Sequence, residues 1–285
     1  MDFRNKFIVK PDGKLRLKEI DPAFKGQHES RETAAPELEK YRQQLLELQA
    51  LLYAEKKHAI LIVLQGLDAS GKDGTVKHVF GAFNPQGANV ISFKQPTPVE
   101  KNHDFLWRVH PHAPEKGWVA IFNRSHYEDV LIARVHKLVD KAICAARYEL
   151  IRSFERGLRD DGTTILKFFL HISKEEQLAR FGKRLDDPLR NWKISEADYS
   201  ERQLWDDYVK AFEDALSATS TGEAPWYVIP SNHKWFRDLA VSQIVAGAME
   251  ELGMEFPAPS VDLSVIRRKY HAALAEEGGR NGKQK

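Results

Sequence analysis

The chain has 285 residues, of which 42% are hydrophobic, so it is long and apolar enough for one large domain, and wholesale disorder is excluded. Its formal net charge of only +2 argues against a general nucleic-acid-coating protein, which needs a larger basic excess. We therefore expect no nucleic-acid partner. A single cysteine, Cys144, excludes an intramolecular disulfide. The N-terminus lacks an apolar signal core and no apolar run reaches roughly 18 residues, so we expect a cytoplasmic protein without a membrane partner.

The N-terminal part of the chain divides into a polar arm and a helix. Residues 1–35 are polar, with turn signals at 11–13 and 21–22, and we expect them to form an extended arm on the domain or on a partner subunit. From Pro36 to about Lys56, apolar residues recur at three- and four-residue spacing. This spacing predicts an amphipathic helix.

Strand and helix patterns alternate along the rest of the chain. The apolar run at 58–65 is too short for a typical helix and predicts a buried parallel strand. Further strands are predicted at 89–93, 118–122, 164–170 and 226–229, and helices at 73–82, 99–109, 125–137, 140–160, 173–185, 197–216 and 234–252. The alternation predicts an α/β three-layer sandwich around a mostly parallel five-stranded sheet.

The first predicted strand leads into a glycine-rich segment with the sequence Gly66-Leu67-Asp68-Ala69-Ser70-Gly71-Lys72. A strand before it and a helix after it are the context of a phosphate-binding P-loop. The glycines let successive N–H groups face one anion, and the helix N-terminus adds a positive dipole. We expect Lys72 to contact phosphate oxygens and to offset charge during transfer. The alternative is a glycine-rich turn without a ligand.

Two acidic residues depart from the usual P-loop pattern. Asp73 follows Lys72, where a nucleotide-binding P-loop has Ser or Thr to hold magnesium. Since a carboxylate facing a phosphate would repel it, we expect Asp73 to point away and cap the helix, with Thr75 as the substitute hydroxyl. Asp68 lies inside the loop, where it can bind Mg²⁺ or orient the acceptor phosphate. A turn-stabilising hydrogen bond is the alternative role for Asp68.

A second candidate site follows the strand predicted at 118–122. In a P-loop sheet this strand end faces the phosphates, and an acid normally holds metal there. Here the residue is Asn123, which is uncharged. Arg124 can clamp a phosphate in bidentate fashion, and Glu128 is the nearest carboxylate by spacing. Arg134 lies on the following helical stretch and can point back toward the cleft.

An ordered series of motifs resembles the family-2 polyphosphate kinases over roughly residues 36–255. The segments that carry the resemblance are 66–74, 83–87, 92–96, 122–131, 184–188, 191–193 and 224–230. Asn-Arg-Ser followed by His-Tyr-Glu-Asp at 123–129 is similar to the branch termed class III. The departure at Asn123 leaves the metal ligands of this chain open.

The resemblance implies transfer of a terminal phosphate from inorganic polyphosphate to a nucleotide. The acceptors implied are AMP and ADP, giving ATP, with GMP and GDP as further candidates, and the reaction is expected to be reversible. The implied fold is a P-loop kinase core with a helical lid, similar to thymidylate kinase, assembled as a homodimer or homotetramer. We therefore expect a kinase domain over 36–257 with a lid around 178–196, and a partly disordered tail over 258–285. Mg²⁺ is the expected cofactor, with Mn²⁺ as an alternative.

The lid region carries a basic cluster on either side of the break at 186–188. If the cluster forms a flap, its guanidinium groups can close onto the transferring phosphate, whereas the alternative is a solvated helix face. Such a flap, with Lys94, Arg124 and Arg134, would complete a positive channel for a linear polyanion. The cluster consists of Arg180, Lys183, Arg184, Arg190 and Lys193.

The predicted roles are therefore as follows. Catalysis is assigned to Asp68, Lys72, Arg124 and Arg184. Phosphate or polyphosphate binding is assigned to Gly66, Ala69, Ser70, Gly71, Lys72, Asp73, Gly74, Thr75, Lys94, Arg134, Arg180, Lys183, Arg190 and Lys193. Nucleotide binding is assigned to Asp68, Asn123, Arg124 and Glu128, and metal binding to Asp68 and Glu128.

Two other functions compete with this interpretation. An ATP-dependent nucleotide or nucleoside kinase would use the same core, but Asp73 counts against it because such a P-loop keeps Ser or Thr after the lysine. A non-catalytic module that binds polyphosphate or a nucleotide would need neither the lid arginines nor Asp68 beside Lys72. Since phosphoryl transfer is in-line and direct, no protein nucleophile is expected.

Overall fold

The computed structural model describes residues 1–281. The contacts within the chain divide it into two units, Met1–Met254 and a C-terminal unit that begins at Glu255. Across residues 1–281, no helix combines the length and the apolar character that crossing a bilayer requires.

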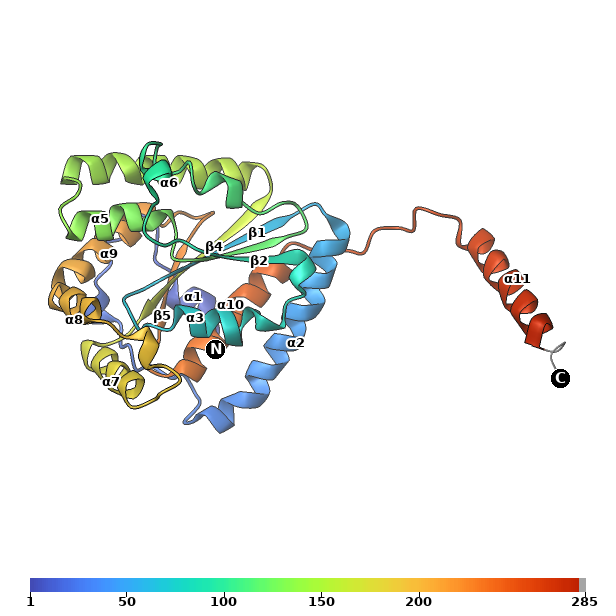
Figure 1. Ribbon diagram of the computed structural model, residues 1–285, viewed down its shortest axis with the longest axis horizontal. Coiled ribbons are helices and arrows are strands. Elements are labelled where there is room, and N and C mark those ends of the chain that lie inside the picture. Colours follow the sequence, from blue (N-terminus) through green and yellow to red (C-terminus); the bar gives the residue numbers. More distant parts are fainter. Residues whose placement is uncertain (282–285) are drawn as a thin grey trace. The chain divides into compact units, whose positions relative to one another are not determined.

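The first unit is built on a five-stranded sheet whose neighbouring strands are all parallel (Figure 1). The strand order is β2-β3-β1-β4-β5. The strands are β1 (Ala59–Gln65), β2 (Ala88–Ser92), β3 (Val119–Asn123), β4 (Thr163–His171) and β5 (Trp226–Pro230). All five predicted strands form, so the predicted α/β fold with its five-stranded sheet is confirmed. Every residue of the central strand β1 is buried, as expected for a parallel strand covered on both faces.

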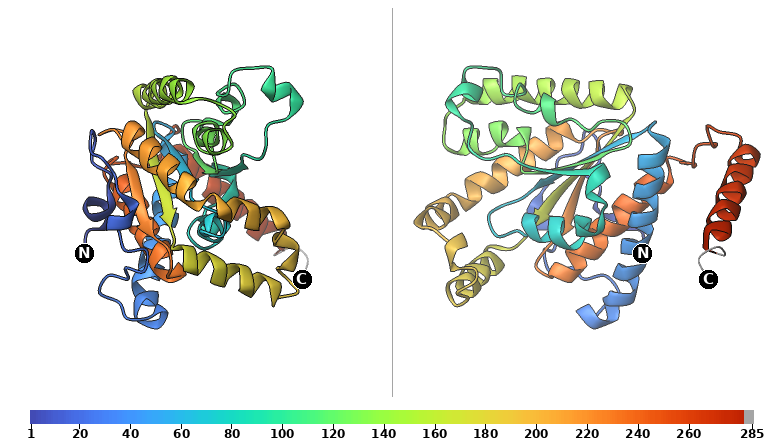
Figure 2. Two further views of the ribbon diagram at one scale, coloured as in Figure 1. Left: turned by 90° about the vertical axis from the view of Figure 1, so that its left-hand side faces the viewer. Right: turned by 45° about the vertical axis from the view of Figure 1, so that its right-hand side comes forward.

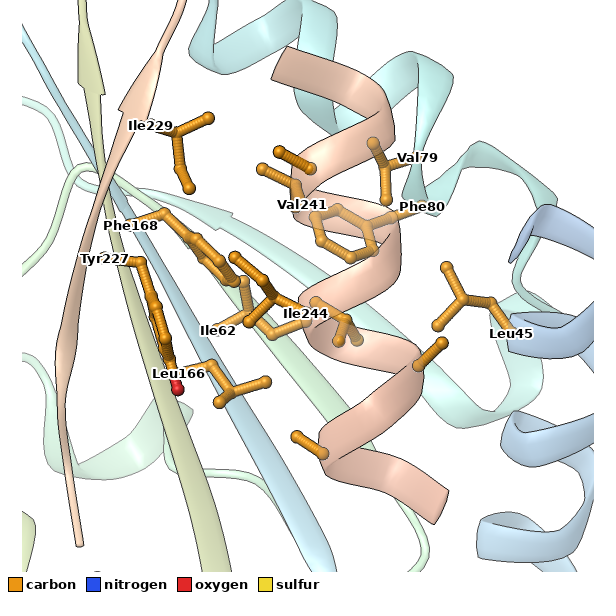
Figure 3. Packing of buried hydrophobic residues seen from close by; sticks show 14 of the residues in the cluster. Leu45, Ile62, Val79, Phe80, Leu166, Phe168, Tyr227, Ile229, Val241 and Ile244 are labelled. Atoms are coloured by element: carbon orange, nitrogen blue, oxygen red, sulfur yellow. The ribbon is translucent and has the colours of Figure 1, made fainter. Parts of the chain in front are cut away.

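Helices cover both faces of this sheet, which gives the predicted three layers (Figures 1 and 2). Alternate residues of β1 enter two separate cores, because side chains of a strand point to opposite faces. One face carries α2 (Arg31–Glu55), α3 (Lys72–His78) and α10 (Lys234–Glu250), and the other carries α6 (Lys141–Asp160) and α9 (Trp205–Thr219). In Figure 3, Val241 and Ile244 of α10 lie against Ile62 and Phe168 of the sheet.

The segment expected to form a lid, called the lid region below, lies between β4 and α9. It consists of α7 (Lys174–Leu185), a 3₁₀ turn over Asn191–Lys193 and α8 (Glu196–Gln203). The helix predicted at 197–216 is therefore two helices, with Leu204 at the C-cap of α8.

Several helix limits differ from those predicted. Helix α2 begins five residues before Pro36, because Ser30 and Thr33 form a capping box. Of the helix predicted at 99–109, only the first turn forms, as α4 (Pro98–Lys101). The segment predicted as a helix at 125–137 is a 3₁₀ turn, η5 (His126–Val130), followed by α5 (Ile132–Val135).

The two ends of the chain contain more regular structure than their polar sequences suggest. The N-terminal arm begins with α1 (Phe3–Phe7), whose phenylalanines pack against Phe236. Just beyond it, Ile8 forms an antiparallel bridge with Tyr227 of β5. In the C-terminal unit, a helix, α11 (Leu263–Asn281), occupies the segment expected to be a partly disordered tail. The last part of that predicted tail, 282–285, lies outside the described residues.

Candidate active site

The loop between β1 and α3 has the backbone of a P-loop, as the sequence predicts. Gly66 and Gly71 have φ of +152° and +110°, in the region that favours glycine. A Cβ on Gly66 would lie 2.8 Å from the carbonyl oxygen of Leu170, and one on Gly71 would lie 1.9 Å from Arg237 Nη1. Only glycine therefore fits at both positions. Helix α3 begins directly after Gly71, at Lys72, so its N-terminus points into the loop.

The side chain of Lys72 folds back over this loop. Its Nζ donates hydrogen bonds to the carbonyl oxygens of Gly66 at 2.6 Å and Leu67 at 3.3 Å. Burial, with the positive charge of Arg124, lowers the pKa of Lys72 to about 8. The charged form of Lys72 is therefore less favoured than that of an exposed lysine. This ammonium lies where a phosphate chain would meet the loop.

Arg124 joins the P-loop to the segment after β3. Its Nη2 lies 2.9 Å from Asp68 Oδ1, and its Nη1 lies 3.4 Å from Glu128 Oε2. Arg124 has φ of +63°, which is uncommon outside glycine, and its N–H donates to the carbonyl oxygen of Leu64 in β1 at 3.0 Å. Three of the predicted site residues, Asp68, Arg124 and Glu128, are therefore brought together.

Asp73 lies between Asn123 and the lid. Its carboxylate accepts a hydrogen bond from Asn123 Nδ2 at 2.9 Å and one from Lys193 Nζ at 3.2 Å. Burial opposes its ionisation, but Asn123 and Lys193 hold the pKa of Asp73 below its usual value. The expectation that Asp73 caps α3 is wrong, because the N-cap is Gly71 and no side chain caps that end. Thr75 is fully buried and donates to the carbonyl oxygen of Gly71 at 3.2 Å.

Arg180 of α7 supports the P-loop through its carbonyl groups. Its Nη1 donates to the carbonyl oxygens of Ala69 at 2.8 Å and Ser70 at 3.0 Å, and its Nε donates to Glu176 at 2.7 Å. The side chain is almost fully buried. The sequence assigns Arg180 to polyphosphate, but this guanidinium is already committed to the loop backbone.

The other predicted basic residues lie at different distances from the loop. Arg184 is near Asp198, at 3.7 Å, and Arg190 pairs with Asp187, both within the lid. Lys94 and Lys183 are exposed. Arg134 pairs with Asp214 at 2.7 Å and lines a separate cavity between the N-terminal arm, α6 and α9. Lys193, which pairs with Asp73, therefore connects the segment expected to form the lid with α3, the helix that follows the P-loop.

Comparison with known proteins places this architecture in one family. The family model described as Polyphosphate kinase 2 (PPK2) matches residues 28–257. The chain belongs to the polyphosphate kinase 2 family. This confirms the resemblance found in the sequence, and the protein is an enzyme that transfers phosphate between polyphosphate and nucleotides.

Individual relatives resemble this polyphosphate kinase over nearly the whole chain. An AMP/ADP-polyphosphate phosphotransferase of Meiothermus ruber is 51% identical, with 89% of this chain and 96% of the relative covered. An ADP-polyphosphate phosphotransferase of Rhodopseudomonas palustris is 45% identical, with 84% and 85% covered. The crystal structure of Polyphosphate Kinase 2 from Arthrobacter aurescens TC1 superposes with a TM-score of 0.91 at 41% identity, covering 94% of this chain and 95% of that one.

The structure adds a group of residues that sequence reasoning missed in this polyphosphate kinase. A cavity beside Asp68, Arg124 and Glu128 is also lined from α7, α8 and α9. Tyr208 donates a hydrogen bond to Glu201 at 2.6 Å across this group. The added lining residues are Gln177, Glu201, Arg202, Trp205, Tyr208 and Phe212. The signal available was the aromatic stripe of 205, 208 and 212, at helical spacing after the lid.

The acidic residues suit a metal ion that the substrate helps to hold. Among residues 1–281, no three His, Cys, Asp or Glu side chains gather as a metal cluster. Asp68 and Glu128 nevertheless converge on the same guanidinium. Mg²⁺ in kinases is bound by one or two carboxylates together with phosphate oxygens and water. The two carboxylates are therefore compatible with a divalent metal ion whose coordination phosphate completes, and a divalent-metal requirement is what the kinase family suggests.

Proposed function

We propose that this polyphosphate kinase phosphorylates both nucleoside mono- and diphosphates, carrying AMP to ADP and ADP to ATP, with guanine nucleotides as further acceptors. One observation carries the proposal: Lys72 at the P-loop and Arg124 after β3 lie together beside two carboxylates. A phosphate chain and an acceptor phosphate need such a pair of cations at one point. The names of relatives support these acceptors, because they describe phosphotransferases for AMP/ADP, ADP, NDP and GDP.

In this mechanism the chain positions two anions and neutralises the charge between them. The P-loop N–H groups and Lys72 bind the donor phosphates, while Arg124 orients the acceptor and stabilises the equatorial oxygens. The lid residues Arg184 and Lys193 close over the transferring group and exclude water. No side chain forms a covalent intermediate, since the transfer is in-line.

Asp68 and Glu128 would hold Mg²⁺, with Mn²⁺ as the alternative. When bound, the ion neutralises phosphate charge and fixes phosphate orientation. The carboxylates also keep Arg124 in place through the ion pairs of 2.9 and 3.4 Å. The expected homodimer or homotetramer and the cytoplasmic location remain predictions from the sequence.

An acceptor panel tests this function. The purified chain would be incubated with long-chain polyphosphate, Mg²⁺ and one of AMP, ADP, GMP or GDP, and products would be separated by ion-exchange chromatography. We expect ADP and then ATP from AMP, and ATP from ADP. Phosphorylation of ADP with no product from AMP would restrict the activity to diphosphates and contradict the proposal.

A further inference from the structure

Behind the candidate active site lies a fully buried polar network that the mechanism above does not use. Lys167, in the middle of β4, is completely buried in a strand whose neighbours are apolar. Its Nζ donates to Glu155 Oε2 of α6 at 2.6 Å, to the hydroxyl of Tyr127 at 3.0 Å and to the carbonyl oxygen of Thr219 at 2.8 Å. Tyr127 in turn donates to Glu155 Oε1 at 2.8 Å.

This network is closed and its charges are paired. All three donors of the Lys167 ammonium are used, and both oxygens of Glu155 have partners. His126 lies alongside, with Nε2 3.4 Å from Glu155 Oε1. Burial alone would raise the pKa of Glu155, but Lys167 and His126 hold it below its ordinary value. A buried ion pair seldom adds net stability compared with apolar residues of similar size, so stability alone does not explain this one.

The network ends on the segment that carries Arg124. Ser125, His126 and Tyr127 follow it directly and are fully buried. The hydroxyl of Ser125 accepts hydrogen bonds from the Tyr127 N–H and from Gln65 Nε2, each at 3.2 Å. Gln65 is the last residue of β1, immediately before the P-loop. The segment is thus fixed to the P-loop strand at Ser125 and to the network at Tyr127.

Such fixing is needed because Arg124 has an unfavourable backbone conformation. A non-glycine residue at φ of +63° is in a strained backbone conformation, which persists only where its surroundings hold it. The guanidinium must also stay between Asp68 and Glu128, and Glu128 lies on the same 3₁₀ turn as Tyr127. A shift of this turn would therefore move both the cation and one carboxylate.

We propose that Tyr127, Glu155 and Lys167 are positioning residues for phosphoryl transfer: together they hold the turn after β3 so that Arg124 and Glu128 face the P-loop. The proposal rests on the role given to Arg124 in the proposed function. The network should therefore affect kcat, and this effect can be measured separately from any effect on folding.

The main test is a double-mutant cycle. Tyr127→Phe removes one hydroxyl and keeps the ring, which packs edge-on against Trp226 at 4.8 Å between centroids. We expect kcat to fall about tenfold or more, since small misplacements of a reacting group have effects of that size. In an Arg124→Gln background, Tyr127→Phe should lower kcat far less, because most of its effect acts through Arg124 and only the displacement of Glu128 remains. An equal loss in both backgrounds would overturn the proposal.

The matched control is Tyr227→Phe. Tyr227 is also fully buried in the sheet, and its hydroxyl accepts a hydrogen bond from Arg4 at 3.4 Å, in the other core. The kcat of the Tyr227→Phe variant should remain within about twofold of the wild type. If Arg124→Gln alone leaves kcat unchanged, the role of Arg124 in the proposed function fails instead, so the two failures can be told apart.

A second variant covers the case in which Tyr127→Phe does not fold. Glu155→Leu combined with Lys167→Met replaces the ion pair by apolar side chains of similar length and leaves no buried charge. We expect this protein to melt close to the wild-type temperature but to show the same loss of kcat. A folded double variant with unchanged kcat would contradict a positioning role.

Discussion

Asn123 at the end of β3 donates a hydrogen bond to Asp73 at the start of α3, over 2.9 Å. In a usual P-loop kinase the hydroxyl donor is on the loop helix and the acid is on the strand. Here the acid is on the helix and the uncharged donor is on the strand. The hydrogen bond between strand end and helix is kept, but donor and carboxylate have exchanged positions. Asp73 also accepts a hydrogen bond from Lys193 of the lid region.

This exchange leads to a prediction about the donor. Asn123→Asp would place a second carboxylate against Asp73, so polyphosphate should bind less well. We expect its KM to rise on the order of tenfold, or about 1.4 kcal/mol. The variant Asp73→Asn/Asn123→Asp restores one donor and one acceptor, and it should recover most of the loss. The measurement is the KM for polyphosphate at saturating ADP, and an exchange variant worse than both single variants would refute the pairing.

The lowered pKa of Lys72 predicts a pH dependence. The free enzyme carries the cation below pH of about 8 and loses it above, so kcat/KM for polyphosphate should fall as pH rises through about 8. Lys72→Ala should retain the fold and lose roughly a hundredfold or more of turnover. The profile would be measured from pH 6.5 to 9.5. A flat profile in the wild type would contradict the role of this ammonium.

Metal dependence tests the two carboxylates beside Arg124. Chelation by EDTA should abolish transfer, and added Mg²⁺ should restore it. Asp68→Asn and Glu128→Gln should each raise the Mg²⁺ concentration for half-maximal rate by about tenfold, because each removes one anionic ligand. Glu47→Gln, on the exposed side of α2, is the control and should match the wild type. If the Mg²⁺ concentration for half-maximal rate is unchanged in both variants, Asp68 and Glu128 are not the metal ligands.

The position of Arg184 in the lid region predicts that its removal lowers kcat but not the binding of polyphosphate. Within residues 1–281, the polar partners of Arg184 are the carbonyl oxygen of Lys193 at 3.4 Å and Asp198 at 3.7 Å, so its guanidinium can turn toward a transferring phosphate. Arg184→Ala should lower kcat about tenfold or more while the KM for polyphosphate changes little. Arg156→Ala, an exposed charge on α6, should leave both constants unchanged. A rise in KM alone would assign Arg184 to ground-state binding.

The fold could largely be predicted from local patterns. The apolar run of β1 required burial on both faces, and a helix after each strand implied parallel neighbours. The P-loop could be predicted because Gly66 and Gly71 are needed by the backbone itself. Arg124 and Glu128 could be found because strand ends of a parallel sheet meet at one edge.

Other features depend on partners distant in the chain. The burial of Arg180 is decided by how α7 packs on the P-loop more than a hundred residues earlier. Arg134 turns to Asp214, which the helical spacing around Tyr127 could not reveal. Lys167 looked like an ordinary strand residue because its partners lie on other elements, on η5, α6 and α9.

The central claim is that this P-loop takes its phosphate from an inorganic chain. The most direct measurement is ATP formation by luminescence from ADP, Mg²⁺ and long-chain polyphosphate, with no nucleoside triphosphate added and Lys72→Ala in parallel. We predict steady ATP production by the wild type and almost none by the variant. Transfer only when ATP is supplied as the donor, with no product from polyphosphate, would contradict the claim and indicate an ATP-dependent nucleotide kinase.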